Sequence, residues 1–189
     1  GVIDLEKTIT IQEKDIQDYG TGSIRYEKPG TRYSIKTLAR LMMEKSDNTA
    51  AYLLASEIIG LNEIQKLVSD WGLTQTDMKN NKSSVKDMNK ILTKMYRGQI
   101  TSGELTKEML GFMDDSDFED RITVGIPLYI KVYHKTGDEV GKIHDVAIID
   151  LPERPYYLGI MTTDQTDEEE TKKKMARISQ IIFTEVTDL

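Results

Sequence analysis

The sequence predicts an α+β domain in which an antiparallel β-sheet is flanked by helices. Three observations support this prediction. The middle of the chain repeats apolar residues at helical spacing, the last third contains three runs of β-branched and aromatic residues, and the C-terminal segment returns to helical spacing. The 189 residues, 38% of them hydrophobic, suffice for one domain with its own core. We therefore expect a single domain over residues 1–189.

The first stretch, residues 1–32, alternates Thr with Ile and then becomes rich in glycine, which predicts extended segments and turns with little core. From Ser34, a favoured N-cap residue, apolar residues recur at helical spacing, so a helix is expected up to about Lys45. Four further helices should follow. They cover residues 50–59, which are almost entirely apolar, 64–71, 85–95 and 105–113, and the first three are closed by Gly60, Gly72 and Gly98.

Three strands are expected in the last third, over residues 129–136, 143–150 and 156–163. The segments between them are short and rich in turn residues, so the strands should pair as antiparallel hairpins. Tyr129 and Tyr133 would share one face of the first strand and pack there. A final helix is expected over residues 164–186. Its acidic residues precede its lysines, which suits the helix dipole and predicts a solvated charged face.

Composition excludes several classes of partner and cofactor. With 25 Lys plus Arg against 32 Asp plus Glu, the net charge of −7 gives no reason to expect nucleic acid or an anionic membrane as a partner. Cysteine is absent and the histidines are His134 and His144, so disulfides, thiolate metal sites and three-histidine metal sites are excluded. We expect no metal and no other cofactor, and structural roles for both histidines. No apolar run approaches the roughly 20 residues of a membrane span.

Two tripeptides lie at predicted element boundaries: Ser-Asp-Asn at 46–48, between two helices, and Lys-Thr-Gly at 135–137, at the end of the first strand. In a chain of this composition the pair is expected by chance about 0.003 times, and about half as often in this order. A hydroxyl beside an ammonium can relay a proton to a leaving nitrogen during acyl transfer, and Ser46 and Lys135 fit that pairing. The alternative is that Ser46 is only a helix cap and Lys135 a solvated strand residue.

The neighbours of these two residues offer contacts to a substrate. Lys135 would attract a substrate carboxylate, Thr136 would hydrogen-bond it, and Gly137 would let the strand backbone come close. Asn48 carries a side-chain amide that can pair with an amide on the acyl side of a substrate. Together these residues predict a site for a small molecule or a peptide.

With these residues the sequence resembles the penicillin-recognising serine hydrolase superfamily, and within it the class A β-lactamase-like group, whose signatures are Ser-x-x-Lys, Ser-x-Asn and Lys-Thr-Gly. The resemblance covers about residues 4–186, including the segments 33–34 and 144–148. It implies the β-lactamase/transpeptidase fold, an extracytoplasmic location, and β-lactams or D-Ala-D-Ala peptides of the cell wall as substrates. It also implies that the backbone N–H of Asp138 belongs to the oxyanion hole.

The nucleophile signature Ser-x-x-Lys occurs once, from Ser83 to Lys86. It follows the Ser-x-Asn tripeptide, whereas the resemblance places the nucleophile before it, so we expect Ser83 to be a helix N-cap. In the resemblance the nucleophile helix would end just before Gly1. We therefore expect a domain that is incomplete at the N-terminus, without its N-terminal strands and nucleophile helix, and inactive as the isolated chain. The alternative is a catalytically inactive binding or scaffold domain of the same fold.

The loop that precedes the helix near Ser84 bears on hydrolysis. Class A β-lactamases release the acyl group with a glutamate on this loop. Between Trp71 and Ser84 the chain has one acidic residue, Asp77, and no glutamate. The resemblance therefore implies poor deacylation, as in a peptidase-like or slowly deacylating member.

Overall fold

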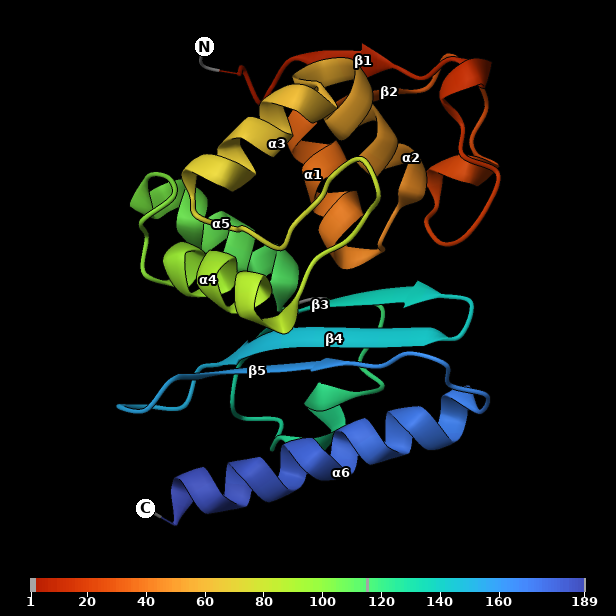
Figure 1. The fold of residues 1–189 in the computed structure, drawn as a ribbon. Coiled ribbons are helices and arrows are strands. Elements are labelled where there is room, and N and C mark those ends of the chain that lie inside the picture. Colours follow the sequence, from red (N-terminus) through yellow and green to blue (C-terminus); the bar gives the residue numbers. More distant parts are fainter. Residues whose placement is uncertain (1–2, 115, 189) are drawn as a thin grey trace.

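The computed structural model describes residues 3–114 and 116–188. A three-stranded antiparallel sheet lies between a layer of helices and one long helix, α6 (Figure 1). The strands are β1 (Thr8–Thr10), β2 (Arg32–Ser34), β3 (Val132–Glu139), β4 (Lys142–Ile149) and β5 (Tyr156–Met161). The α-helices are α1 (Ile35–Glu44), α2 (Asn48–Tyr52), α3 (Leu61–Asp70), α4 (Val85–Tyr96), α5 (Gly103–Met113) and α6 (Glu168–Thr187). The prediction of an antiparallel sheet flanked by helices is confirmed.

The main sheet has the strand order β3-β4-β5, with β3 paired to β4 over its whole length. Strand β3 ends three residues later than predicted, because it continues past Thr136 to Glu139 and the hairpin turn consists of residues 140–141 alone. Gly137 does not break the strand but pairs with His144 in the ladder. The Lys-Thr-Gly tripeptide therefore lies inside a strand instead of at its end.

The start of β3 also differs from the prediction. The chain turns at Pro127, whose carbonyl accepts a hydrogen bond from the N–H of Ile130 at 2.9 Å, and the strand begins only at Val132. Tyr129 lies in this preceding turn and is 81% exposed, whereas Tyr133 lies in the strand and is buried. The two tyrosines therefore do not share a strand face, and only the packing role of Tyr133 is confirmed.

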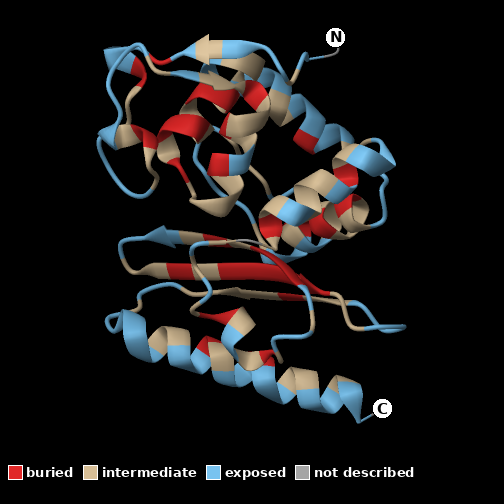
Figure 2. Cartoon of the chain, turned by 180° about the vertical axis from the view of Figure 1, so that it is seen from behind, coloured by how far each residue is buried: buried red, intermediate tan, exposed pale blue. Residues whose placement is uncertain are grey.

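Each face of the main sheet is covered by a different layer. The face toward α4 and α5 packs through one core cluster, made of Leu92, Met95, Met113, Tyr133, Val146 and Ile148. The face toward α6 and a short 3-10 helix (Ile122–Gly125) packs through another, made of Ile122, Ile126, Val132, Ala147, Ile149 and Leu158. Since successive residues of a strand point to opposite faces, the central strand β4 is buried on both, as Figure 2 shows. Each fully buried aliphatic side chain contributes about 1.5–3 kcal/mol.

The helical layer surrounds a third core cluster. Ser34 caps α1 as predicted, because its Oγ accepts a backbone N–H of the first turn at 3.1 Å. Helix α2 continues as a π-helical segment (Leu53–Ile59) and ends at Gly60, whose φ of +92° favours glycine. The N-terminal stretch contributes more than expected, because Ile11 and Ile24 are fully buried in this cluster. Two short strands, β1 and β2, pair antiparallel beside it.

Helix α6 runs along the far face of the sheet from the other helices (Figure 1). Its N-cap is Asp167, which accepts the N–H of Glu170 at 3.0 Å. The acidic first turn and the later lysines agree with the predicted charge order. In residues 3–114 and 116–188, no helix is long and apolar enough to cross a membrane.

Candidate active site

The Ser-Asp-Asn tripeptide connects α1 to α2. Asp47 is the N-cap of α2, since its Oδ1 accepts the N–H of Ala50 at 3.0 Å. Ser46 precedes the cap with a φ of +48°, an uncommon value for a residue other than glycine. Ser46 is therefore not the helix cap. Its hydroxyl faces the sheet, where it meets Lys135.

Asp47 also holds the N-terminal loop against the tripeptide. Its Oδ2 accepts the backbone N–H groups of Ser23 at 2.7 Å and Ile24 at 2.9 Å. The carboxylate is 1% exposed, so it satisfies buried donors of two separate segments. Thr21 adds a second tie, because its Oγ1 donates to the carbonyl of Ser46 at 2.8 Å. The position of Ser46 thus depends on this loop.

Two glycines permit this close approach. Gly20 and Gly22 have φ values of +67° and +113°, in the region that favours glycine. A Cβ atom on Gly20 would lie 2.3 Å from Nδ2 of Asn48, and one on Gly22 would lie 2.4 Å from Cγ of Asp47. The loop can therefore lie on the tripeptide only because both positions lack a side chain.

Lys135 reaches Ser46 from the middle of β3. Its ammonium donates to the Oγ of Ser46 and, at 2.9 Å, to the carbonyl of Thr136. Burial is the main reason why the pKa of Lys135 is lowered from 10.5 to about 8; the negative charges of Asp145 and Asp138 oppose this shift, and the positive charge of Arg121 adds to it. Lys135 is not a freely solvated strand residue. At neutral pH it is a cation that loses its proton more easily than an ordinary lysine.

A cavity of about 760 Å³ lies between the edge strand β3, the start of α2 and the loop before α4. Its lining includes all the predicted substrate-binding residues as well as Ser46: Ser46, Asn48, Thr136, Gly137 and Asp138. Asn48 is held in place by donating its Nδ2 to the carbonyl of Tyr19 at 3.0 Å. The structure therefore brings the two predicted tripeptides together at one cavity, with the Lys135 ammonium bonded to Ser46.

Sequence analysis missed Arg121, which is 1% exposed and lies directly under the Lys-Thr-Gly strand. Its two Nη atoms donate to the two carboxylate oxygens of Asp138 at 2.6 and 2.7 Å. Its Nη1 also donates to the carbonyl of His144 at 2.9 Å, and its Nε donates to Asp120 at 3.0 Å. Such a fork binds a carboxylate more rigidly than a lysine would. No pattern around Arg121 marked it, because its partner Asp138 is 17 residues away.

His134 is fully buried under the strand, which agrees with a structural role. Its Nδ1 lies 3.0 Å from Asp145 and its Nε2 lies 3.2 Å from Glu119. Burial lowers the pKa of His134, but the hydrogen bonds to the two carboxylates outweigh it and raise the pKa from 6.5 to about 9. Asp145 also accepts the N–H of Ile122 at 3.2 Å. The protonated imidazole therefore joins β3, β4 and the segment before the short 3-10 helix.

This arrangement predicts a pH-dependent stability. Because the pKa of His134 is raised on folding, its contribution is fully present below pH 6.5 and is lost as the pH rises toward 9. The free energy of unfolding should fall by about 2 kcal/mol from pH 6 to pH 8, measured by urea denaturation. Above pH 8 the lowered pKa of Lys135 makes the free energy of unfolding rise with pH, which opposes the effect of His134. The measurement is therefore made between pH 6 and pH 8. The variant His134→Gln should lose this dependence, and a wild type equally stable at both pH values would contradict it.

The loop before α4 forms another wall of the cavity, and it corrects the expectation for Ser83. Ser84 is the N-cap of α4, since its Oγ accepts the N–H of Asp87 at 3.2 Å. The hydroxyl of Ser83 instead lies 2.9 Å from Oγ1 of Thr76 and faces the cavity. Asp87, which is fully buried, anchors the loop by accepting the Thr76 hydroxyl at 2.9 Å. The expected cap is displaced by one residue, because the helix begins at Val85.

Asp77 is the acidic residue of this loop, and its carboxylate is occupied within the loop itself. Its Oδ1 accepts the N–H groups of Lys79 at 3.0 Å and Asn80 at 3.1 Å, and its Oδ2 accepts the side-chain amide of Asn80 at 2.6 Å. These hydrogen bonds, that from the Asn80 side chain first, lower the pKa of Asp77. A carboxylate held in this way is a weak general base.

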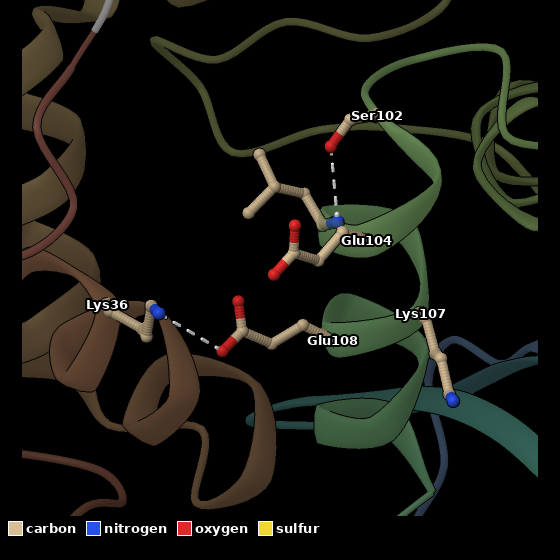
Figure 3. A pocket seen from close by; sticks show the side chains of 6 residues that line it. Lys36, Ser102, Glu104, Lys107 and Glu108 are labelled. Carbon is tan, nitrogen blue, oxygen red and sulfur yellow. Dashed lines mark hydrogen bonds and ion pairs between the residues drawn. The ribbon is translucent and has the colours of Figure 1, made fainter.

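A second hollow, of about 630 Å³, lies between α1 and α5 (Figure 3). Lys36 projects from α1 toward Glu108 of α5, with 3.4 Å between Nζ and Oε1, and Lys36 also pairs with Glu6 at 2.9 Å. The hydroxyl of Ser102 is used as the cap of α5. This hollow is therefore a charged surface cleft in which Lys36, Glu108 and Ser102 already have partners. In the described part of the chain no cluster of three or more His, Asp or Glu side chains could hold a metal ion.

Comparison with known proteins gives consistent relatives. A model of the Beta-lactamase2 family, described as the Beta-lactamase enzyme family, matches residues 1–186. The chain is 26% identical over 189 residues to Beta-lactamase ROB-1 of Haemophilus influenzae, covering 91% of this chain and 61% of that protein. It is 25% identical over 197 residues to Beta-lactamase 3 of Bacillus cereus, covering 95% and 62%. The chain thus spans about three fifths of the length of these curated relatives.

Solved structures show the same fold. The structure of PBP-A superposes with a TM-score of 0.90 at 24% identity, over 99% of this chain and 74% of that one. A class A β-lactamase of the last common ancestor of Gram-negative bacteria superposes with a TM-score of 0.87 at 21% identity, over 97% and 76%. An L158E mutant of PBP-A, also with a TM-score of 0.90, is an acyl-enzyme complex with penicillin G. At these identities the likeness concerns the fold.

Proposed function

Because the chain belongs to the Beta-lactamase enzyme family, we propose that it carries the substrate-binding and proton-relay residues of a serine acyl-enzyme that acts on β-lactams or D-Ala-D-Ala cell-wall peptides. The observation that carries the proposal is the contact between the ammonium of Lys135 and the hydroxyl of Ser46 at the cavity. Asn48 and Thr136 line the same cavity, at positions suited to the acyl side and the leaving side of a substrate.

In the proposed reaction a serine hydroxyl attacks the carbonyl carbon of the substrate amide, and its proton goes to a base on the nucleophile's segment. The carbon–nitrogen bond then breaks. The leaving nitrogen takes the proton of the Ser46 hydroxyl, and Ser46 regains a proton from the Lys135 ammonium. The backbone N–H of Asp138 would stabilise the negative charge on the carbonyl oxygen. The lowered pKa of Lys135 favours this relay, since the ammonium gives up its proton more readily.

We propose that the nucleophile lies outside residues 1–189, so that these residues form a β-lactamase-like domain without its N-terminal strands and nucleophile helix. Within the 189 residues the Ser-x-x-Lys spacing occurs only at Ser83. The hydrogen-bond partner of its hydroxyl is Thr76, so among the described contacts no lysine or carboxylate takes its proton directly. No metal or other cofactor enters the proposed steps.

The proposed enzyme deacylates slowly. A general base for hydrolysis would lie on the loop before α4, where Asp77 is the acidic residue and its carboxylate is bonded within its own turn. A D,D-peptidase-like or slowly deacylating enzyme fits this loop better than a fast β-lactamase. From these proposed substrates we infer a location outside the cytoplasm, in the secreted or cell-surface space, and we propose no nucleic acid as a partner and no membrane contact by this segment.

A catalytically inactive binding or scaffold domain is the second candidate. It is favoured by the contact of the Ser83 hydroxyl, which is hydrogen-bonded to Thr76 and not to Ser46 or Lys135. An inactive relative would retain the cavity with Asn48 and Thr136 but would have no nucleophile. Such a domain would bind penicillin or a D-Ala-D-Ala peptide reversibly and would form no covalent adduct.

Treatment with a fluorescent penicillin separates these candidates. We expect the full-length protein to be labelled covalently on a serine outside residues 1–189. The 189-residue chain should show no adduct by mass spectrometry, because it lacks an activated serine. Ser83→Ala in the full-length protein is the matched control and should leave labelling unchanged. An adduct on Ser83 would overturn the assignment, and a full-length protein that binds penicillin without any label would favour the binding domain.

A further inference from the structure

The loop before α4 carries a lysine, Lys82, that lines the cavity from a different element than Thr136 and Asn48 do. Lys82 is exposed, but its backbone is fixed. Its N–H donates to the carbonyl of Asp77 at 3.0 Å, and its carbonyl accepts the N–H of Asp77 at 2.8 Å. The side chain of Lys82 therefore starts from a fixed point at the edge of the cavity.

Side chains of the two flanking helices hold this loop in place. Gln65 of α3 accepts the N–H of Met78 on its Oε1 at 2.8 Å. Asp87 of α4, which is fully buried, accepts the N–H of Gln75 on its Oδ2 at 2.6 Å. A ligand that meets Lys82 thus meets a wall that is already formed, and little ordering of the loop is needed on binding.

Asp77 is the acidic neighbour of Lys82, but its carboxylate is bonded within its own turn. It accepts the N–H groups of Lys79 and Asn80 and the side-chain amide of Asn80. The hydrogen bonds from Asn80 are the main reason why the pKa of Asp77 is lowered, and the charge of Lys82 contributes least. Among the described residues no carboxylate lies within 4.0 Å of the Lys82 ammonium. This ammonium is therefore available to a ligand.

The other charged residues that line the cavity have partners of opposite charge. Asp138 binds the guanidinium of Arg121 at 2.6 and 2.7 Å, and Glu139 pairs with Lys142. Because the charges within each pair largely cancel, Lys82 gives the wall formed by the loop a positive charge. An anionic group near this wall is attracted.

This positive charge is separate from that of Lys135. Lys135 acts from β3, beside Thr136, where the proposed function places the leaving side of a substrate. Asn48, at the start of α2, is suited to the amide on the acyl side. With these two walls occupied, the group that faces the loop before α4 is the side chain on the acyl side. Lys82 therefore meets a part of the substrate that Lys135 does not.

We propose that Lys82 is a specificity-determining residue, which selects acyl donors that carry a free carboxylate on the acyl side in addition to the one on the leaving side. The inference rests on the proposed function and narrows its substrate class. The preferred substrates are β-lactams with an anionic acyl side chain and cell-wall peptides with a free side-chain carboxylate ahead of the scissile bond. A neutral acyl side chain enters the same cavity but lacks the attraction of Lys82.

Two penicillins that differ by one carboxylate test the inference. Carbenicillin has a carboxylate on its acyl side chain where benzylpenicillin has a hydrogen atom, and both have the carboxylate of the leaving side. The acylation rate of the full-length protein with each compound is measured by intact mass spectrometry, and reversible binding by calorimetry. We expect Lys82→Gln to lower the carbenicillin-to-benzylpenicillin ratio about fivefold, as the loss of an exposed ion pair would. Lys82→Glu should lower the ratio further, because repulsion replaces attraction.

Lys79→Gln is the matched control. Lys79 is an exposed lysine of the same loop that is not among the residues lining the cavity, so the variant has the same net charge as Lys82→Gln. It should change the ratio less than about twofold, because solvent and salt screen its charge from the cavity. In the wild type, raising the NaCl concentration to about 0.5 M should lower the ratio, since screening weakens the attraction of Lys82.

The outcomes separate the inference from the proposed function. A ratio that falls with Lys82→Gln and with salt, but not with Lys79→Gln, supports the inference. If both penicillins acylate or bind the protein and Lys82→Gln changes the ratio no more than Lys79→Gln does, only the inference fails. If Lys82→Gln raises the ratio, the sign is wrong and the inference is overturned. If neither penicillin binds to or acylates any form, the proposed function fails and the inference fails with it.

Discussion

Replacing Lys135 with alanine should slow acylation of the full-length protein by a fluorescent penicillin about a hundredfold. This corresponds to about 3 kcal/mol of transition-state stabilisation. The reason is the loss of the ammonium that donates to the Ser46 hydroxyl and resupplies its proton. Lys135→Arg should slow acylation less than Lys135→Ala does, because arginine retains the positive charge, although with a different geometry. The rate constant is measured by gel fluorescence over time.

Ser46→Ala provides the matched comparison. It should slow acylation while leaving the melting temperature nearly unchanged, since Asp47 and not Ser46 caps α2. A fall in melting temperature with unchanged acylation in both variants would mean that these residues are structural. Unchanged rates in both would overturn the assignment of the relay.

The pH dependence of acylation gives the same assignment a separate readout. Burial lowers the pKa of Lys135 to about 8, and the relay needs the protonated amine. Acylation should therefore decrease as the pH rises through about 8, whereas an ordinary lysine would keep its charge up to about 10.4. Lys135→Arg should remove this decrease, because arginine stays charged.

Replacing Asp47 with alanine should lower the free energy of unfolding by about 3–4 kcal/mol. The buried carboxylate accepts three backbone N–H groups, from Ser23, Ile24 and Ala50. Its loss would leave three backbone donors without this acceptor, of which those of Ile24 and Ala50 are buried and that of Ser23 is half-buried, each costing roughly 1 kcal/mol or more. Urea denaturation followed by circular dichroism measures the effect.

Ser34→Ala is the control for the loss of a helix cap alone. Ser34 caps α1 through one backbone N–H, so its removal should cost only about 1 kcal/mol. Asp47→Asn should fall between the two, because one of its two acceptor oxygens remains. If Asp47→Ala lowered the free energy of unfolding no more than Ser34→Ala does, the loop would be held by other contacts.

The elements of the fold were predictable where periodicity and caps agree. Ser34 and the apolar spacing behind it gave the start of α1, and the hairpin-length turns gave the antiparallel order of β3, β4 and β5. The boundaries of β3 were not predictable, because glycine is typical of turns, whereas Gly137 pairs with His144 within the sheet. The end of β3 is set by its hydrogen-bonded pairing with β4, and the local sequence pattern carries no information about that pairing.

The candidate site was predictable in its residue types but not in its supports. The two tripeptides are 89 residues apart, and their resemblance to a known family, not their spacing, suggested that Ser46 and Lys135 meet. Arg121 carried no signal, since a buried arginine depends on distant carboxylates such as Asp138. Ser83 and Ser84 are equally good caps by composition, and only the phase of α4 distinguishes them.

The double attachment of Asp47 has a consequence for motion around the cavity. The loop at 19–24 and the first turn of α2 share one carboxylate, and Gly20 and Gly22 leave no space for the two segments to slide past each other. The amide protons of Ser23, Ile24 and Ala50 thus become exchangeable in one local opening event instead of three. In energetic terms the two segments form a single cooperative unit, and a fluctuation that frees the loop also releases Ser46 from the position where it meets the strand.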